Sequence, residues 1–218
     1  MSPDLQKNGE TRQPRYLQFI ALLAFHTFIK EGIDATIVEV HHGGEFDVTN
    51  LISKPVVTGI TSLGMDHVAE LGPTIENIAW HKAGIMKTGA PAFSAPQEPG
   101  PAGVISKRAG EKETTVKFVS TDATLPVNNR VLGAPVQRLN CSIALEMTRA
   151  FLQLKAHGHT LDSNDVASGV ESFSWNGRFE IIEDGQSQWF IDGAHNSLSL
   201  QQAGKWFATN ANASSAQR

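Results

Sequence analysis

The sequence of 218 residues contains a single cysteine, Cys141, so no disulfide can form within the chain. Cys141 lies in an apolar-periodic run and is predicted to pack as a small hydrophobic residue in a reducing compartment. No apolar run approaches the roughly 20 residues that a membrane span needs, and residues 1–15 lack the hydrophobic core of a signal peptide. The formal net charge of -4 leaves no basic footprint for nucleic acid or a membrane surface. The composition therefore predicts a soluble, intracellular, globular protein whose partners are small molecules.

Helical and strand-like patterns alternate along most of the chain. A helix is expected from Pro14 to Gly32, followed by two short β-branched strands at 35–40 and 55–61. Continuous apolar runs of this length are typical of strands covered on both faces, so the pattern predicts an α/β fold with a doubly wound, mostly parallel sheet. The further predicted elements are helix 74–83, strand 90–95, helix 104–112, strand 114–120, helices 137–155 and 163–171, a hairpin at 179–192 turning at Asp184-Gly185, and helix 197–207.

Lys82 is the residue that says most about a possible functional site. It follows Ile75, Ile78 and Ala79 at helical spacing, which places it on the inward face of that helix. A buried ammonium group costs several kcal/mol or loses its proton. The neutral amine can react with CO2 to form a carbamate, which is an anionic oxygen ligand for Mg2+. The alternative is a lysine that snorkels at a helix end, because Gly84 is placed to stop the helix.

The loop after the predicted strand 35–40 has the composition of a ligand-binding loop. Gly43 and Gly44 allow close approach of the backbone to a phosphate or substrate. Glu39, Asp47 and Asp66 are oxygen donors of the kind Mg2+ prefers. Four histidines, His41, His42, His67 and His81, raise zinc as an alternative. None has the i, i+4 helical pairing or the cysteine neighbours that favour zinc, so that alternative is the weaker one.

Two motifs flank the predicted hairpin. Trp175–Arg178 contains an Asn-Gly turn, and Arg178 suits a phosphate clamp. Asp192–Asn196 follows an apolar strand, and Asp192 suits a ribose hydroxyl or a metal-bound water. A surface ion pair for Arg178 and an Asx-type turn capping the last helix are the structural alternatives.

The order of these pieces resembles the folylpolyglutamate synthases of the Mur-ligase superfamily, especially the eukaryotic, fungal-like branch. The resemblance covers about residues 15–207 and rests on five motifs in the same order. These motifs are Val38–Asn50, Pro55–His67, Leu71–Lys87, Trp175–Arg178 and Asp192–Asn196.

The resemblance implies a ligase that forms carbon-nitrogen bonds. In such enzymes ATP phosphorylates the γ-carboxylate of a folate, and the amine of L-glutamate displaces the phosphate. The implied substrates are tetrahydrofolate, L-glutamate and ATP, with Mg2+ and, in addition, a monovalent cation such as K+. A monomer in the cytoplasm or the mitochondrion is expected, without nucleic acid or a membrane span. The alternatives are a dihydrofolate synthase, which uses dihydropteroate, and a non-catalytic remnant or binding module.

The resemblance also implies roles for individual residues. By it, Glu39, His67 and the carbamate of Lys82 are the magnesium ligands, and Lys82 and His195 are catalytic. The residues implied in nucleotide binding are Gln137, Asn140, Arg178 and Asp192. Two cations and an arginine would offset the charge on the transferring phosphoryl group.

The sequence departs from the family pattern in places. Family members carry a Gly-rich P-loop upstream, whereas this chain has none, so the expected fold is a Mur-ligase-like central ATPase domain without its first strand and P-loop, plus the start of a C-terminal α/β domain. Strand 35–40 or a neighbour is expected to have an open apolar edge. Smaller departures are His41-His42 before the glycine pair, Val136 for the adenine-side histidine and Asn176 for a proline. The expected division is a disordered segment 1–13, a partial central domain 14–174, the start of the C-terminal domain at 175–207 and a disordered tail 208–218.

Overall fold

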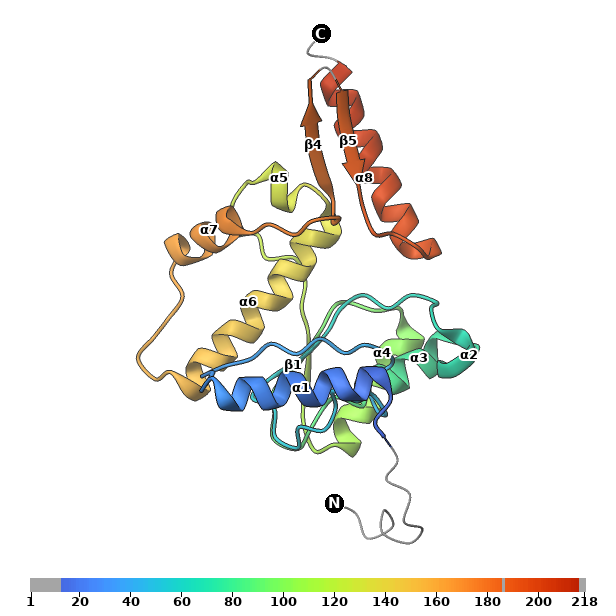
Figure 1. Ribbon diagram of the computed structural model, residues 1–218, viewed down its shortest axis with the longest axis vertical. Coiled ribbons are helices and arrows are strands. Elements are labelled where there is room, and N and C mark those ends of the chain that lie inside the picture. Colours follow the sequence, from blue (N-terminus) through green and yellow to red (C-terminus); the bar gives the residue numbers. More distant parts are fainter. Residues whose placement is uncertain (1–12, 186, 216–218) are drawn as a thin grey trace, which may run out of the picture.

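The computed structural model describes residues 13–185 and 187–215 (Figure 1). Residues 1–12 of the predicted N-terminal segment and residues 216–218 of the predicted tail lie outside the described residues. Within the described part, no helix is long and apolar enough to cross a lipid bilayer.

A three-stranded parallel sheet forms the centre of the larger part of the molecule. The strands β1 (Thr58–Ile60), β2 (Ala92–Ser94) and β3 (Val116–Phe118) are adjacent in chain order, with Thr58 opposite Ala92 and Ala92 opposite Val116. Helices connect consecutive strands, as parallel pairing requires. The predicted α/β fold with a parallel sheet is therefore confirmed, although each strand is shorter than predicted. The connecting helices are α2 (Val68–Leu71) and α3 (Ile75–Ala83) between β1 and β2, and α4 (Pro99–Glu111) between β2 and β3.

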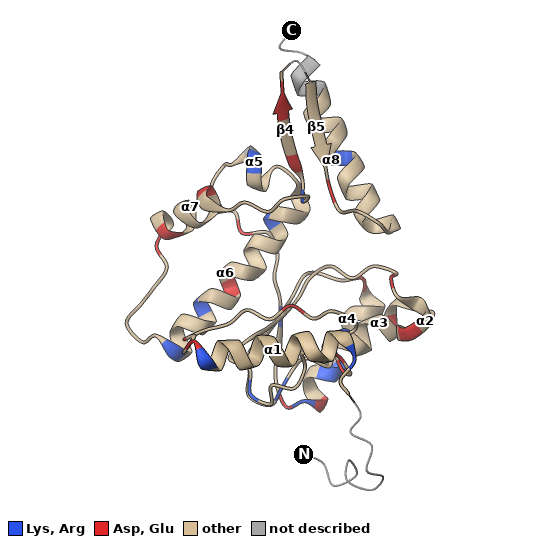
Figure 2. Cartoon of the chain, viewed as in Figure 1, with Lys and Arg blue, Asp and Glu red and all other residues tan. Residues whose placement is uncertain are grey.

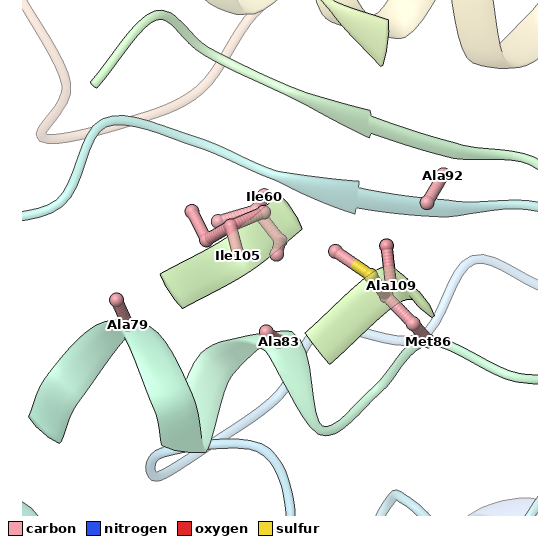
Figure 3. Packing of buried hydrophobic residues seen from close by; sticks show 7 residues of the cluster. All are labelled: Ile60, Ala79, Ala83, Met86, Ala92, Ile105 and Ala109. Atoms are coloured by element: carbon pink, nitrogen blue, oxygen red, sulfur yellow. The ribbon is translucent and has the colours of Figure 1, made fainter. Parts of the chain in front are cut away.

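Both faces of this sheet are covered by helices. On one face, α3 and α4 bury small and branched side chains against β1 and β2, as Figure 3 shows. On the other face, α6 (Pro135–Lys155) packs Ile143 against Phe93 of β2. The helices α5 (Asn129–Leu132) and α7 (Ser163–Ser172) add a third cluster beside α6. The buried residues of the first face are Ile60, Ala79, Ala83, Met86, Ala92, Ile105 and Ala109.

The predicted strand at 35–40 is wrong. These residues have no regular secondary structure, and Ile37 is fully exposed at 101%. A β-branched run forms a strand only when a neighbour accepts and donates ladder hydrogen bonds, and no described residue pairs with this segment. The helix before it is present as α1 (Tyr16–Lys30), but Ala21 is its one buried residue among the described side chains. Figure 2 shows α1 without charge between its two ends.

The chain ends in a hairpin and a helix. Strands β4 (Glu180–Asp184) and β5 (Ser187–Ile191) pair antiparallel, as predicted. The last helix, α8 (Ser197–Ser215), places Trp206 against Phe190 of β5 with 5.4 Å between ring centroids.

The predicted disordered tail is wrong over residues 208–215, which continue α8. The alanines in this stretch favour helix, and neither proline nor glycine interrupts it. Side chains also bond back to the preceding turn, because Asn210 Nδ2 donates to the carbonyl of Trp206 at 2.8 Å.

Candidate active site

The loop that joins residue 40 to β1 is organised by a buried carboxylate. Asp47 accepts hydrogen bonds from the backbone amides of His42 at 2.7 Å and Thr49 at 2.8 Å, and from the Thr49 hydroxyl at 2.6 Å. Burial opposes the ionisation of Asp47, but these hydrogen bonds outweigh it and hold its pKa below the usual value. Asp47, predicted as an oxygen donor for Mg2+, is therefore occupied in holding its own loop.

The glycine pair in this loop allows a close approach to protein. Gly44 has φ +154°, and a Cβ there would overlap the carbonyl oxygen of His81 and lie 3.0 Å from Lys82 Cα. The amide of Glu45 donates to the same carbonyl at 2.8 Å. The predicted close approach is present, but the backbone that Gly44 meets belongs to the end of α3.

Lys82 lies in the last turn of α3. Thr74 begins this helix by accepting a hydrogen bond from the Asn77 amide, while Ile78 and Ala79 are fully buried on its inner face. The Lys82 side chain is half-buried. Burial lowers the pKa of its ammonium group, and the negative charges of Asp66 and Asp47 only partly offset this effect. A larger neutral fraction of the amine follows, which is the state that reacts with CO2.

Asp66 connects residues that are far apart in the sequence. Its Oδ2 accepts a hydrogen bond from Asn196 Nδ2 at 3.0 Å and lies 3.6 Å from His195 Nε2. Its Oδ1 accepts from the amide of His67 at 2.8 Å. The main cause that lowers the pKa of Asp66 is the hydrogen bond from Asn196. The charges of His67 and His195 act in the same direction. The carboxylate of Asp66 thus contacts His195 and Asn196, and its charge raises the pKa of Lys82 against the effect of burial.

Two residues of the C-terminal motif are oriented by local hydrogen bonds. His195 Nδ1 lies 2.8 Å from the Gly193 carbonyl, which leaves Nε2 facing Asp66. Asn196 Oδ1 accepts from the Ser199 amide at 2.9 Å and so caps α8, while its amide nitrogen reaches Asp66. The capping role considered from the sequence and a contact with the site are both present. The sequence did not identify Asn196 as a separate site residue, because an asparagine before a helix is also the residue type expected for a helix cap.

The two motifs that flank the hairpin are joined. The Gly193 amide donates to the Gly177 carbonyl at 2.9 Å, and Asp192 Oδ2 accepts from the Phe179 amide at 2.9 Å. The guanidinium of Arg178 is exposed and lies against Gly193, where a Cβ would collide with it. Arg178 and Asp192 therefore each contact the segment that carries the other, which holds the two motifs together.

The other predicted residues lie apart from Asp66. Gln137 and Asn140 are half-buried in the first turns of α6, where Asn140 Nδ2 donates to Gln137 Oε1 at 3.3 Å. Glu39 is exposed, and over residues 13–185 and 187–215 no hydrogen bond or ion pair joins it to His67 or Lys82. The roles of these three residues stay predictions.

A second group of donors lies beside the site. His42, His67 and Glu70 each offer one ligand atom, and these atoms lie within 4.8 Å of one another. The sequence raised His42 and His67, together with His41 and His81, as a weaker zinc alternative, and it did not identify Glu70. The spacing of His67 and Glu70, three residues apart at the start of α2, was the available signal.

Comparison with solved structures defines the class of fold. The apo form of FPGS from L. casei matches with a TM-score of 0.79 and 25% identity, over 94% of this chain and 54% of that one. An FPGS-AMPPCP complex matches with a TM-score of 0.75 and 26% identity, over 88% of this chain and 52% of that one. The predicted Mur-ligase-type α/β fold is thus confirmed.

Curated relatives make the resemblance more specific. Folylpolyglutamate synthase of Neurospora crassa is 40% identical over 89% of this chain, and that of Saccharomyces cerevisiae is 38% identical over 89%. This chain is therefore homologous to folylpolyglutamate synthases over most of its length, as its five motifs predicted. It spans 38% and 37% of the lengths of these two relatives. No protein-family model matches the sequence.

Proposed function

We propose that this chain takes part in the ATP-dependent attachment of L-glutamate to the γ-carboxylate of a tetrahydrofolate. The observation that carries the proposal is the contact of Asp66 with His195 and Asn196, which joins two separate motifs in a chain homologous to folylpolyglutamate synthases. The charge of Asp66 also acts on Lys82, which belongs to a third motif. A solved relative, an FPGS-AMPPCP-folate complex with a TM-score of 0.76 and 26% identity, supports ATP and folate as ligands. The acceptor carboxylate would be phosphorylated by ATP, and the glutamate amine would then displace phosphate.

The donor set supports a magnesium ion in this site. His67 and a carbamate on Lys82 would hold it, with Glu39 proposed as a further ligand from the family resemblance. Asp66 adds a carboxylate beside His67. Bound Mg2+ would offset the negative charge of the phosphoryl group during transfer.

The remaining residues are proposed to position the substrates. Arg178 would contact phosphate and Asp192 the ribose, as the family resemblance implies, and each contacts the segment that carries the other. Gln137 and Asn140 are proposed on the adenine side. His195, oriented by the Gly193 carbonyl, would present Nε2 to the reacting groups next to Asp66. A monomer in the cytoplasm or mitochondrion also stays a prediction.

A ligation assay tests the proposed activity. The purified chain is incubated with MgATP, tetrahydrofolate and radiolabelled glutamate, and folate-linked label is measured after chromatography. We expect label with the natural sequence and its loss in Lys82→Met. In a parallel reaction, dihydropteroate replaces tetrahydrofolate as the acceptor, which tests the dihydrofolate synthase alternative. Absence of label from folded protein with either acceptor would contradict ligase activity for this chain and favour a binding module.

The carbamate has a readout of its own. With 13C-labelled bicarbonate, NMR should detect a carbamate carbon in the natural sequence and none in Lys82→Met. Lys87→Met is the matched control, because burial also lowers the pKa of Lys87, but Lys87 interacts with Lys112 and Glu45 and not with Asp66. A signal that disappears in Lys87→Met and persists in Lys82→Met would reverse the assignment.

A further inference from the structure

Three potential metal ligands from different segments meet at the start of α2. His42 comes from the loop after residue 40, His67 precedes α2, and Glu70 belongs to α2. The rings of His42 and His67 lie 4.3 Å apart between centroids, and His42 Nε2 lies 4.0 Å from Glu70 Oε2. Neither His42 nor Glu70 belongs to the ligand set that the family resemblance implies.

His42 has an unsatisfied nitrogen at this place. Its Nε2 is buried and has no hydrogen-bond partner among the described residues, which is costly for a polar atom. The backbone is held in position, because the His42 amide donates to Asp47 at 2.7 Å. His67 has φ 51°, in the left-handed region that non-glycine residues rarely adopt. The buried Nε2 of His42 therefore has no hydrogen-bond partner in the described part of the chain, although Glu70 Oε2 lies 4.0 Å from it.

We propose that His42, His67 and Glu70 form a binding site for a first-row transition-metal dication such as Zn2+. Two imidazoles and one carboxylate suit Zn2+, Co2+ or Ni2+ better than Mg2+ or Ca2+, whose ligands are mainly oxygen atoms. Three protein ligands leave at least one coordination position for water or an exogenous ligand. A cavity of about 500 Å3, which His42 and Glu70 border together with Tyr16, gives access to that position.

The distances require only small side-chain rotations. Tetrahedral coordination with bonds of about 2.1 Å places ligand atoms roughly 3.4 Å apart, and here they lie within 4.8 Å of one another. Glu70 can move, since its side chain is 61% exposed. His67 Nε2 also lies 4.0 Å from Asp66 Oδ1, so Asp66 is the nearest competing partner of that imidazole.

The metal site does not depend on the proposed ligase activity. It shares His67 with the proposed magnesium site, however, so a transition ion bound there would compete for that imidazole. The two proposals remain separable, because metal binding is detected by the absorption of the bound ion and the ligase proposal by labelled folate.

Cobalt titration of the complete chain tests the site. After treatment with a chelator, the protein is titrated with Co2+ while visible absorption is recorded, and Zn2+ is then added in competition. We expect one Co2+ per chain, displacement by equimolar Zn2+ and no displacement by millimolar Mg2+. His42→Ala should weaken binding by at least about tenfold. His41→Ala is the matched control, because His41 is the adjacent histidine but lies outside the ligand group, and it should bind as the natural sequence does.

Two results would overturn the proposal. One is the absence of saturable Co2+ absorption in the natural sequence, and the other is equal affinity in His42→Ala. If circular dichroism shows that His42→Ala is unfolded, Glu70→Gln replaces it, because this exposed side chain can be changed without disturbing the core. Unchanged affinity in folded Glu70→Gln would then refute the three-ligand site.

Discussion

Apolar side chains have opposite environments in two regions of the molecule. Between β1 and α4 they are buried, and Ile78 and Ile105 are completely inaccessible. In α1 and residues 33–40 comparable residues face outward, with Ile29 at 82% and Ile37 at 101% exposure. Figure 1 shows the first region wound around the sheet, whereas α1 runs along its outside. The exposed large apolar residues of α1 are Tyr16, Leu17, Phe19, Ile20, Leu22, Leu23 and Ile29.

The difference shows that hydrophobicity determines burial only where a second surface is present. Helices α3 and α4 face each other and the sheet, so small residues such as Ala79 and Ala83 permit close packing. Helix α1 has a more apolar sequence but little opposing surface among the described residues. An apolar patch of this kind is a site of association or aggregation.

An isoleucine-to-alanine substitution should lower the free energy of unfolding far more in the first region than in the second. Ile105→Ala removes a fully buried side chain and leaves a cavity, so we expect a loss of about 2–5 kcal/mol in the free energy of unfolding. Ile37→Ala changes a fully exposed side chain and should remain within about 0.5 kcal/mol. Urea unfolding followed by circular dichroism measures both. Similar losses in the two variants would mean that residues 33–40 are packed in solution.

A glycine substitution tests how closely the N-terminal region approaches the core. Gly44→Ala puts a Cβ against the backbone of His81 and Lys82, which cannot yield as a side-chain end can. We expect a loss of about 1–3 kcal/mol. Gly103→Ala in α4 is the control, because nothing lies within 4 Å of its Cβ position, and it should stabilise the helix by about 0.5–1 kcal/mol. If Gly44→Ala is as stable as the natural sequence, the loop packs less closely against the end of α3 than this backbone contact requires.

Acid should release the N-terminal loop before it affects the sheet. The pKa of Asp47 is lowered in the folded state, so its contribution to stability is complete above the unfolded pKa near 3.8 and is lost as the pH falls through the lower folded value. Limited proteolysis at 41–50 should therefore increase below about pH 4, by an amount equivalent to about 1 kcal/mol. Asp47→Asn should remove this pH dependence. Cleavage that rises equally in both proteins would assign the transition to other carboxyl groups.

Much of the fold follows from local patterns. Helices α3, α6 and α7 and the β4-β5 hairpin have apolar periodicity or turn residues that agree with their packing, so their positions were predicted. Helix α4 begins before its predicted start, and α5 lies in a stretch for which no helix was predicted. The segment 35–40 has the strand pattern without the strand, because pairing is a property of the neighbours and not of the segment. Residues 208–215 have a polar composition that suggested disorder, although their alanines and side-chain hydrogen bonds favour helix.

The site was predictable where one residue contrasts with its surroundings. Lys82 stood out as a charge among apolar neighbours, and its partial burial agrees with that contrast. Contacts between distant segments were not predictable, as the Asp66-Asn196 hydrogen bond spans 130 residues. The proximity of His42 to Glu70 was not predictable for the same reason, because it depends on how the loop after residue 40 packs on α2 and α3.

The side chain of Asn196 connects two parts of the molecule. One end of its amide caps α8 and the other end donates to Asp66, so a single planar group connects the direction of the last helix with the charge of a carboxylate next to β1. Any event that neutralises Asp66 weakens the hydrogen bond from Asn196 while the cap remains. Protonation of Asp66 is thereby coupled to the strength of the contact between the start of α8 and the segment after β1.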